Sequence, residues 1–70
     1  MNAQKLGKLL CDFRAARQLS PNDLAARLGI SPAAYAALEA GKKQPSVKTF
    51  VALCNALQCT AEELLQWLSD

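Results

Sequence analysis

Two serine–proline pairs, at positions 20–21 and 31–32, constrain the fold of this chain most strongly. A serine before a helix caps its free amides, and proline is favoured as the first helical residue. Each pair is followed by a short apolar run at helical spacing and then by Gly29 or Gly41, and glycine is favoured where helices end. The sequence therefore predicts two short helices that meet at a fixed corner of three residues. Their expected bounds are about 21–28 and 32–40.

The rest of the sequence also predicts helices. Leu6, Leu10 and Phe13 recur at helical spacing in the first part of the chain. Ser46 can cap a fourth helix, and a capping box that begins at Thr60 opens a fifth. We expect an all-α fold, a compact five-helix bundle that forms a single domain over residues 1–70. The three further helices are expected at about 3–18, 47–57 and 61–68.

The composition argues against an enzyme and against a metal protein. The 70 residues include no histidine, and the three cysteines lack the spacing of a zinc site. The adjacent Glu62 and Glu63 project to different sides of a helix, so they cannot act as paired carboxylates. We therefore expect no catalytic residue, no metal, no cofactor and no small-molecule substrate.

No apolar run approaches the ~20 residues needed to cross a bilayer, so we expect no membrane partner. The odd number of cysteines, without a leader-like segment, favours a reducing compartment. We expect a cytoplasmic protein.

Charge is divided unevenly along the chain. Residues 1–48 hold all eight basic groups and three acidic groups, whereas residues 49–70 hold three acidic groups and no basic group. A basic front and an acidic rear suit contact with a polyanion on one side, and they suit a solvated surface equally well.

An ordered set of residues spans almost the whole chain: Leu6-Gly7, Leu10, Phe13-Arg14, Leu19, Asp23-Leu24-Ala25, Leu28-Gly29-Ile30-Ser31, Leu38-Glu39, Gly41, Pro45-Ser46, Leu53, Ala56-Leu57 and Leu64. This set resembles the lambda-repressor/Cro-like helix-turn-helix family, also called the xenobiotic-response-element family. The resemblance implies a repressor-like transcriptional regulator that binds double-stranded DNA, often as a homodimer. It also implies that the third helix is the recognition helix.

One ion pair is expected from the same resemblance. Arg14 falls on the inward side of the first helix, and Glu39 ends the third, where its charge opposes the helix dipole. Family members usually pair an arginine and a glutamate at the matching positions. We therefore expect Arg14 and Glu39 to form a structural ion pair that ties the first helix to the third.

The recognition helix departs from the family pattern. Pro32, Ala33, Ala34 and Ala37 stand where family members generally carry polar residues. None of these side chains forms a hydrogen bond, so they cannot read base edges by direct hydrogen bonding. If this helix enters the DNA groove, we expect contacts mainly to phosphate groups. The residues expected to make them, besides the helix start, are Asn22, Ser31, Lys42, Lys43 and Gln44.

Two other interpretations of the alanine-rich helix stay open. The scaffold could be a DNA-silent protein-interaction module, because small side chains let another helix approach closely. Alternatively, this face could have been emptied by mutation. Alanine is also the best helix former, so the alanines could simply stabilise a short helix.

The last two helices carry more apolar residues than one buried face needs. Exposed apolar patches often mark an interface, and tryptophan is enriched at interface centres. We expect a homodimer whose interface includes Val51, Leu65, Trp67 and Leu68. The alternative is that Trp67 folds back onto its own core.

Overall fold

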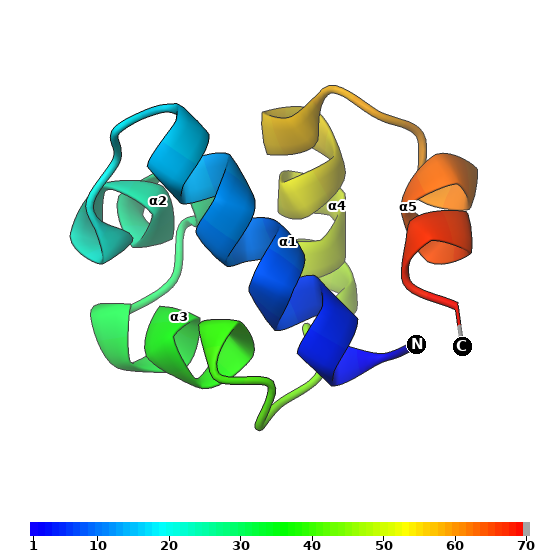
Figure 1. Cartoon of the computed structure of the whole chain (residues 1–70), viewed down its shortest axis with the longest axis horizontal. Coiled ribbons are helices and arrows are strands. Elements are labelled where there is room, and N and C mark those ends of the chain that lie inside the picture. Colours follow the sequence, from blue (N-terminus) through cyan, green and yellow to red (C-terminus); the bar gives the residue numbers. More distant parts are fainter. Residues whose placement is uncertain (70) are drawn as a thin grey trace.

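A computed structural model of the chain describes residues 1–69, and these form five α-helices without strands (Figure 1). The expected all-α five-helix fold is confirmed. Within this part of the chain no helix is both long enough and apolar enough to span a bilayer. The helices are α1 (Ala3–Ala16), α2 (Pro21–Leu28), α3 (Pro32–Glu39), α4 (Val47–Leu57) and α5 (Ala61–Trp67).

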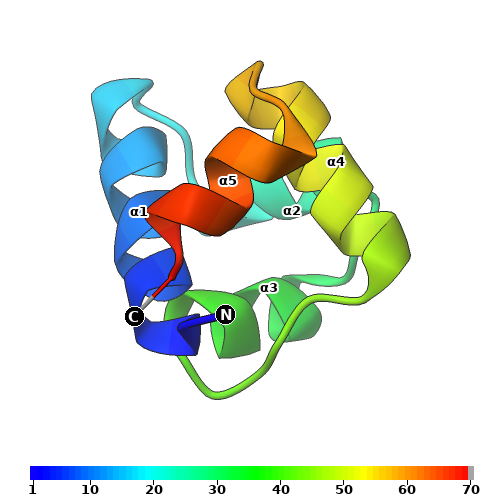
Figure 2. The ribbon, with the colours of Figure 1, turned by 90° about the vertical axis from the view of Figure 1, so that its right-hand side faces the viewer.

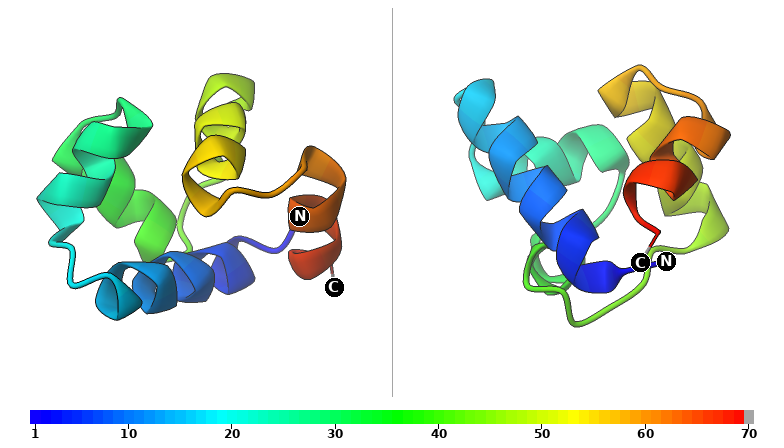
Figure 3. Two further views of the ribbon diagram at one scale, coloured as in Figure 1. Left: turned by 90° about the horizontal axis from the view of Figure 1, so that it is seen from above. Right: turned by 45° about the vertical axis from the view of Figure 1, so that its right-hand side comes forward.

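The helices divide into two groups that share α1. Helices α2 and α3 form one side of the molecule, α4 and α5 form the other, and α1 crosses between them (Figure 1). The view from above shows α1 along one side, with the α2–α3 pair and α4 rising from it (Figure 3). The start of α1 lies close to the end of α5 (Figure 2), and the Asn2 amide donates to the Leu68 carbonyl at 2.8 Å.

Every helix contributes to one apolar core. The inward residues recur three or four positions apart within each helix, as helical periodicity requires. Tyr35 from α3 is the largest fully buried side chain. The other buried apolar residues are Leu6, Leu10, Leu24, Ala25, Leu28, Leu38, Leu53, Cys54, Leu64 and Leu68.

Leu68 corrects one sequence prediction. It was expected at a dimer interface, but it is only 1% exposed and belongs to the core of the single chain. The reason is its helical phase: Leu68 follows Leu64 by four positions, so both side chains project inward. Leu68 is therefore buried within the single chain and is not available to a dimer interface.

The first four helices end in the same way. Each is followed by a residue with a left-handed backbone, and each makes the paired hydrogen bonds of a Schellman motif. Gly29 and Gly41 take this position after α2 and α3, as the sequence suggested. Gln18 and Gln58 take it after α1 and α4, both with φ of 56°. Because Gln18 adopts this conformation, α1 ends at Ala16 and not at residue 18.

Helix α1 lies unusually close to the end of α3. Gly7 is buried, and a Cβ atom placed on it would overlap the carbonyl oxygen of Glu39. A residue without a side chain is therefore required here if the two backbones are to meet.

Candidate nucleic-acid interface

The corner between α2 and α3 is fixed from both sides. Before it, Gly29 (φ 71°) closes α2, and the Ile30 amide donates to the Ala25 carbonyl at 3.1 Å. After it, the Ser31 hydroxyl oxygen accepts from the Ala34 amide at 3.1 Å and caps α3. The start of α2 is held by a full capping box between Ser20 and Asp23. Helix α3 is therefore presented in one orientation.

The outer face of α3 is made of small apolar side chains. Pro32, Ala33, Ala36 and Ala40 are exposed, and Ala34 and Ala37 are partly exposed. Tyr35 and Leu38, by contrast, are fully buried and anchor the opposite face. The alanine face thus points to solvent, and it offers methyl groups and no side-chain hydrogen-bond donor.

The polar residues expected to contact phosphate lie around this face. Asn22, Ser31, Lys42 and Lys43 are exposed. Gln44 is exposed too, but its Nε2 donates to the Met1 carbonyl at 2.9 Å. One of its two amide hydrogens is therefore already used within the chain. This long-range contact has no signal in the sequence.

Arg14 and Glu39 meet through two hydrogen bonds. Arg14 Nη2 donates to Glu39 Oε1 at 2.9 Å, and Nε donates to Oε2 at 3.2 Å. Both side chains are largely buried, with 22% of each exposed. A further hydrogen bond, from Nη1 to the Leu19 carbonyl at 3.3 Å, ties the pair to the α1–α2 connection. Such a two-bond arrangement fixes geometry as well as charge.

The pair changes the ionisation of both partners. Hydrogen bonding to Arg14 holds the pKa of Glu39 below its ordinary value of 4.5, and the same bond raises the pKa of Arg14. Glu39 ends α3, where an unpaired carboxylate would oppose the dipole of that helix. Arg14 therefore holds α3 from the side of α1 and does not lie on the outer face of α3.

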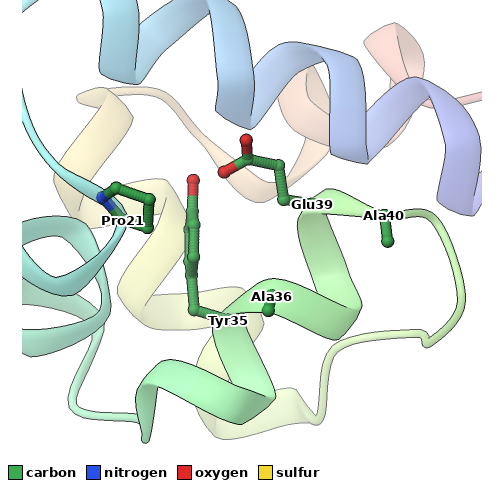
Figure 4. A pocket seen from close by; sticks show the side chains of 5 residues that line it. All are labelled: Pro21, Tyr35, Ala36, Glu39 and Ala40. Carbon is green, nitrogen blue, oxygen red and sulfur yellow. The ribbon is translucent and has the colours of Figure 1, made fainter.

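A groove of about 310 Å³ lies beside this pair (Figure 4), and its lining joins the start of α2 to α3. The Tyr35 ring stands between Pro21 and Glu39, with its hydroxyl directed toward α1 (Figure 4). That hydroxyl makes no hydrogen bond within the described residues. Burial raises the pKa of Tyr35 and keeps its hydroxyl neutral. The lining residues are Pro21, Tyr35, Ala36, Glu39 and Ala40.

Two of the residues expected at a dimer interface, Leu65 and Trp67, lie on different flanks of α5. Val51, Leu65 and Trp67 are each about half exposed, at 53%, 49% and 53%. Leu65 and Trp67, however, are two positions apart on α5, so their side chains project about 200° apart around the helix axis. They therefore flank the buried stripe of α5 on opposite sides.

Val47 was not among the residues predicted to lie on an exposed apolar surface. It is 83% exposed and lies one helical turn before Val51. Val47, Phe50 and Leu65 line a mainly apolar groove of about 270 Å³ together with Met1, Pro45 and Ser46. The four-residue spacing of Val47 and Val51 could have revealed this surface from the sequence. We call Val47, Val51 and Leu65 the apolar surface.

Both the sequence and the structure of this chain are similar to those of known regulators. A family described as helix-turn-helix matches residues 12–64. The uncharacterized HTH-type transcriptional regulator YozG of Bacillus subtilis (strain 168) is 37% identical over 57 residues, which cover 80% of this chain and 68% of that protein. The uncharacterized HTH-type transcriptional regulator YqaE of the same organism is 34% identical over 57 residues. That match covers 81% of this chain and 49% of YqaE, so the chain spans about half the length of this relative.

A solved structure is also similar. The crystal structure of the clp gene regulator ClgR from Corynebacterium glutamicum matches with a TM-score of 0.77 and 28% sequence identity. The match covers 97% of this chain and 72% of that chain.

Proposed function

Because the chain belongs to the lambda-repressor/Cro-like helix-turn-helix family, whose relatives here are named transcriptional regulators, we propose that it binds duplex DNA as a homodimer. In this proposal α3 enters the major groove, and most of the contacts go to phosphate groups. The observation that carries it is the solvent-facing alanine face of α3, held in one orientation by two helix caps.

The small side chains set the kind of contact that α3 can make. Ala33, Ala34 and Ala37 allow the helix backbone to approach the floor of the groove, and their methyl groups can contact thymine methyls. No arginine, asparagine or glutamine on this face can form a two-bond contact with a base. Sequence preference is therefore expected to be low, or to come from DNA shape and dimer spacing.

Phosphate contacts supply the affinity in this proposal. Lys42 and Lys43 directly follow α3 and are exposed. Ser31 and Asn22 add exposed polar groups near the starts of α3 and α2, where the dipoles favour an anion. Each phosphate neutralised by a lysine adds about 0.9 to the salt slope of binding.

A mobility-shift titration of several unrelated duplexes at two or more salt concentrations tests this assignment. Replacing Lys42 and Lys43 together by alanine should weaken binding equally on every duplex and lower the salt slope by roughly 1.8. The matched control replaces Lys5 and Lys8, which lie on α1, and removes the same charge. If the control reduces binding as much, the loop has no special role. If the parent does not bind even at low salt, the protein-interaction alternative gains support.

The homodimer part of the proposal rests on the apolar surface. Val47, Val51 and Leu65 are 83%, 53% and 49% exposed, and grouped exposed apolar side chains often mark an interface. Pairing two copies through this surface would remove it from solvent and stabilise a 70-residue domain.

Sedimentation velocity tests the dimer. Val51→Glu and Leu65→Glu should each shift the protein toward the monomer, because a charge would have to be buried in the interface. Trp67→Gln is the matched control, since Trp67 is equally exposed on the other flank of α5. A parent that sediments as a monomer at all concentrations would refute this part alone.

A further inference from the structure

The end of α4 brings two of the three cysteines together. The Cys59 amide donates to the Cys54 carbonyl at 3.0 Å, and the Gln58 amide donates to the Asn55 carbonyl at 3.3 Å. These are the two hydrogen bonds of a Schellman motif, and Gln58 supplies its left-handed residue. In this motif the side chains at the two ends of the longer hydrogen bond commonly contact each other. Here those side chains are Cys54 and Cys59.

The equivalent positions after α2 show what usually occupies this contact. There the longer hydrogen bond joins Ala25 and Ile30, both apolar and packed at the core. After α4, Cys54 belongs to the buried core and Cys59 packs against that core while staying partly exposed. The positions of an ordinary core contact are therefore occupied by two free thiols, one buried and one partly exposed.

We propose that Cys54 and Cys59 form a modification site, which closes into an intramolecular disulfide when hydrogen peroxide supplies the oxidant. The backbone hydrogen bond between these residues holds their Cα atoms in the short range that a disulfide spans. Disulfides are rare in reducing compartments, and those that do form there are usually transient and serve catalysis or redox sensing.

The reaction proceeds in two balanced steps. The Cys59 thiolate attacks one peroxide oxygen, the O–O bond breaks, and the released hydroxide takes up a proton to leave as water. The Cys54 thiolate then attacks the Cys59 sulfur, the S–O bond breaks, and a second water leaves. The two thiols lose two hydrogens in total, and the peroxide is reduced to two waters.

The surroundings of Cys59 make the first step slow at neutral pH. Burial, the nearby Cys54 thiol and the Glu63 carboxylate raise the pKa of the Cys59 thiol. The reactive thiolate is therefore scarce at pH 7 and becomes more abundant at alkaline pH.

Peptide mapping of the full chain tests the proposal. The protein is treated with hydrogen peroxide at alkaline pH, unfolded, alkylated and digested with trypsin. Lys48 is the last basic residue, so Cys54 and Cys59 share the peptide 49–70, while Cys11 falls in the peptide 9–14. We expect peptide 49–70 to lose two hydrogens, to resist alkylation, and to recover both thiols after reduction. The exposed Cys11 is an internal control for exposure to the oxidant.

Other products would overturn the proposal. Two alkyl groups on peptide 49–70 when Cys11 is already oxidised would show that the pair does not close. A cross-link between peptides 9–14 and 49–70 would assign the bond to different partners. The Cys54→Ala variant separates the roles: its Cys59 should stop at sulfenic acid or oxidise further. A disulfide form that melts below the reduced form would show that the folded geometry does not accommodate the bond.

Discussion

Gly7 sets how closely α1 and α3 can approach. Its missing side chain is the space that the Glu39 carbonyl occupies, and that contact lies directly beside the Arg14–Glu39 pair. The Gly7 contact and the Arg14–Glu39 pair thus both hold α1 against the end of α3. Neither of them touches its outer face.

Gly7→Ala should destabilise the fold although alanine is the better helix former. The gain in helix propensity is about 1 kcal/mol, but the new methyl would overlap backbone atoms that cannot rotate away. We expect a net loss of about 1–3 kcal/mol in the free energy of unfolding, measured by urea denaturation. The control Lys8→Ala, at the next and exposed position, should change it by less than about 0.5 kcal/mol. A Gly7→Ala variant as stable as the parent would show that α1 and α3 are not held in this contact.

Glu39 should make stability depend on pH in the acid range. Its pKa is lowered in the folded chain by hydrogen bonding to Arg14, so the unfolded chain binds the proton more readily. The stabilisation is therefore complete above the ordinary value of 4.5 and is lost as pH falls through the folded value. Glu39→Gln should be less stable than the parent at pH 7, and the difference should shrink below about pH 4.5. Urea denaturation between pH 7 and 3 measures this, and a difference that stays constant with pH would contradict it.

At the scale of elements, the helix starts were predictable and the ends only in part. Ser20, Ser31, Ser46 and Thr60 each cap a helix, because a short hydroxyl side chain signals this role locally. Two of the four Schellman ends carry glycine and could be predicted, but Gln18 and Gln58 give no such signal. In those two places the chain adopts a left-handed conformation that carries a steric cost for glutamine, so the residue type alone does not mark the end of the helix.

Gln58, at a left-handed position, and Gln66, within α5, give a direct test of the backbone conformation at Gln58. Gln58→Gly should stabilise the fold by about 0.5–1 kcal/mol, because glycine adopts the left-handed conformation without a steric cost. Gln66→Gly, within α5, should instead lose about the same amount. Thermal denaturation of both variants measures the difference. Equal losses in the two variants would show that Gln58 is not left-handed in solution.

The candidate site was predictable where it depends on local periodicity. The phase of Tyr35 and Leu38 places the alanines of α3 on the outside, and the structure has them there. The sequence could not show that Gln44 is bound to Met1, because that contact depends on how distant segments pack. The burial of Leu68, by contrast, follows from its position four residues after Leu64 and could have been predicted from helical periodicity.

At the scale of the whole molecule, the chain presents two different exposed surfaces around one shared core. Helix α3 and the Lys42–Lys43 loop form a small, basic surface, whereas Val47, Val51 and Leu65 form the apolar surface on α4 and α5. Helix α1 connects the two surfaces. It contacts α3 through Gly7, and Asn2, which precedes α1, forms a hydrogen bond with Leu68 at the end of α5. In the proposed homodimer, we therefore expect pairing through the apolar surface to leave the alanine face of α3 free in each subunit.

The central claim is that the alanine face of α3 meets duplex DNA, and the alanine methyl groups report on it directly. In a chain with ¹³C-labelled alanine methyls, addition of a duplex should shift the resonances of Ala33, Ala34 and Ala37. The methyls of Ala15 and Ala61, which are exposed on α1 and α5, should stay in place. If the duplex binds but moves only methyls outside α3, or if it moves none at all, the account of this helix as the DNA-contacting element is contradicted.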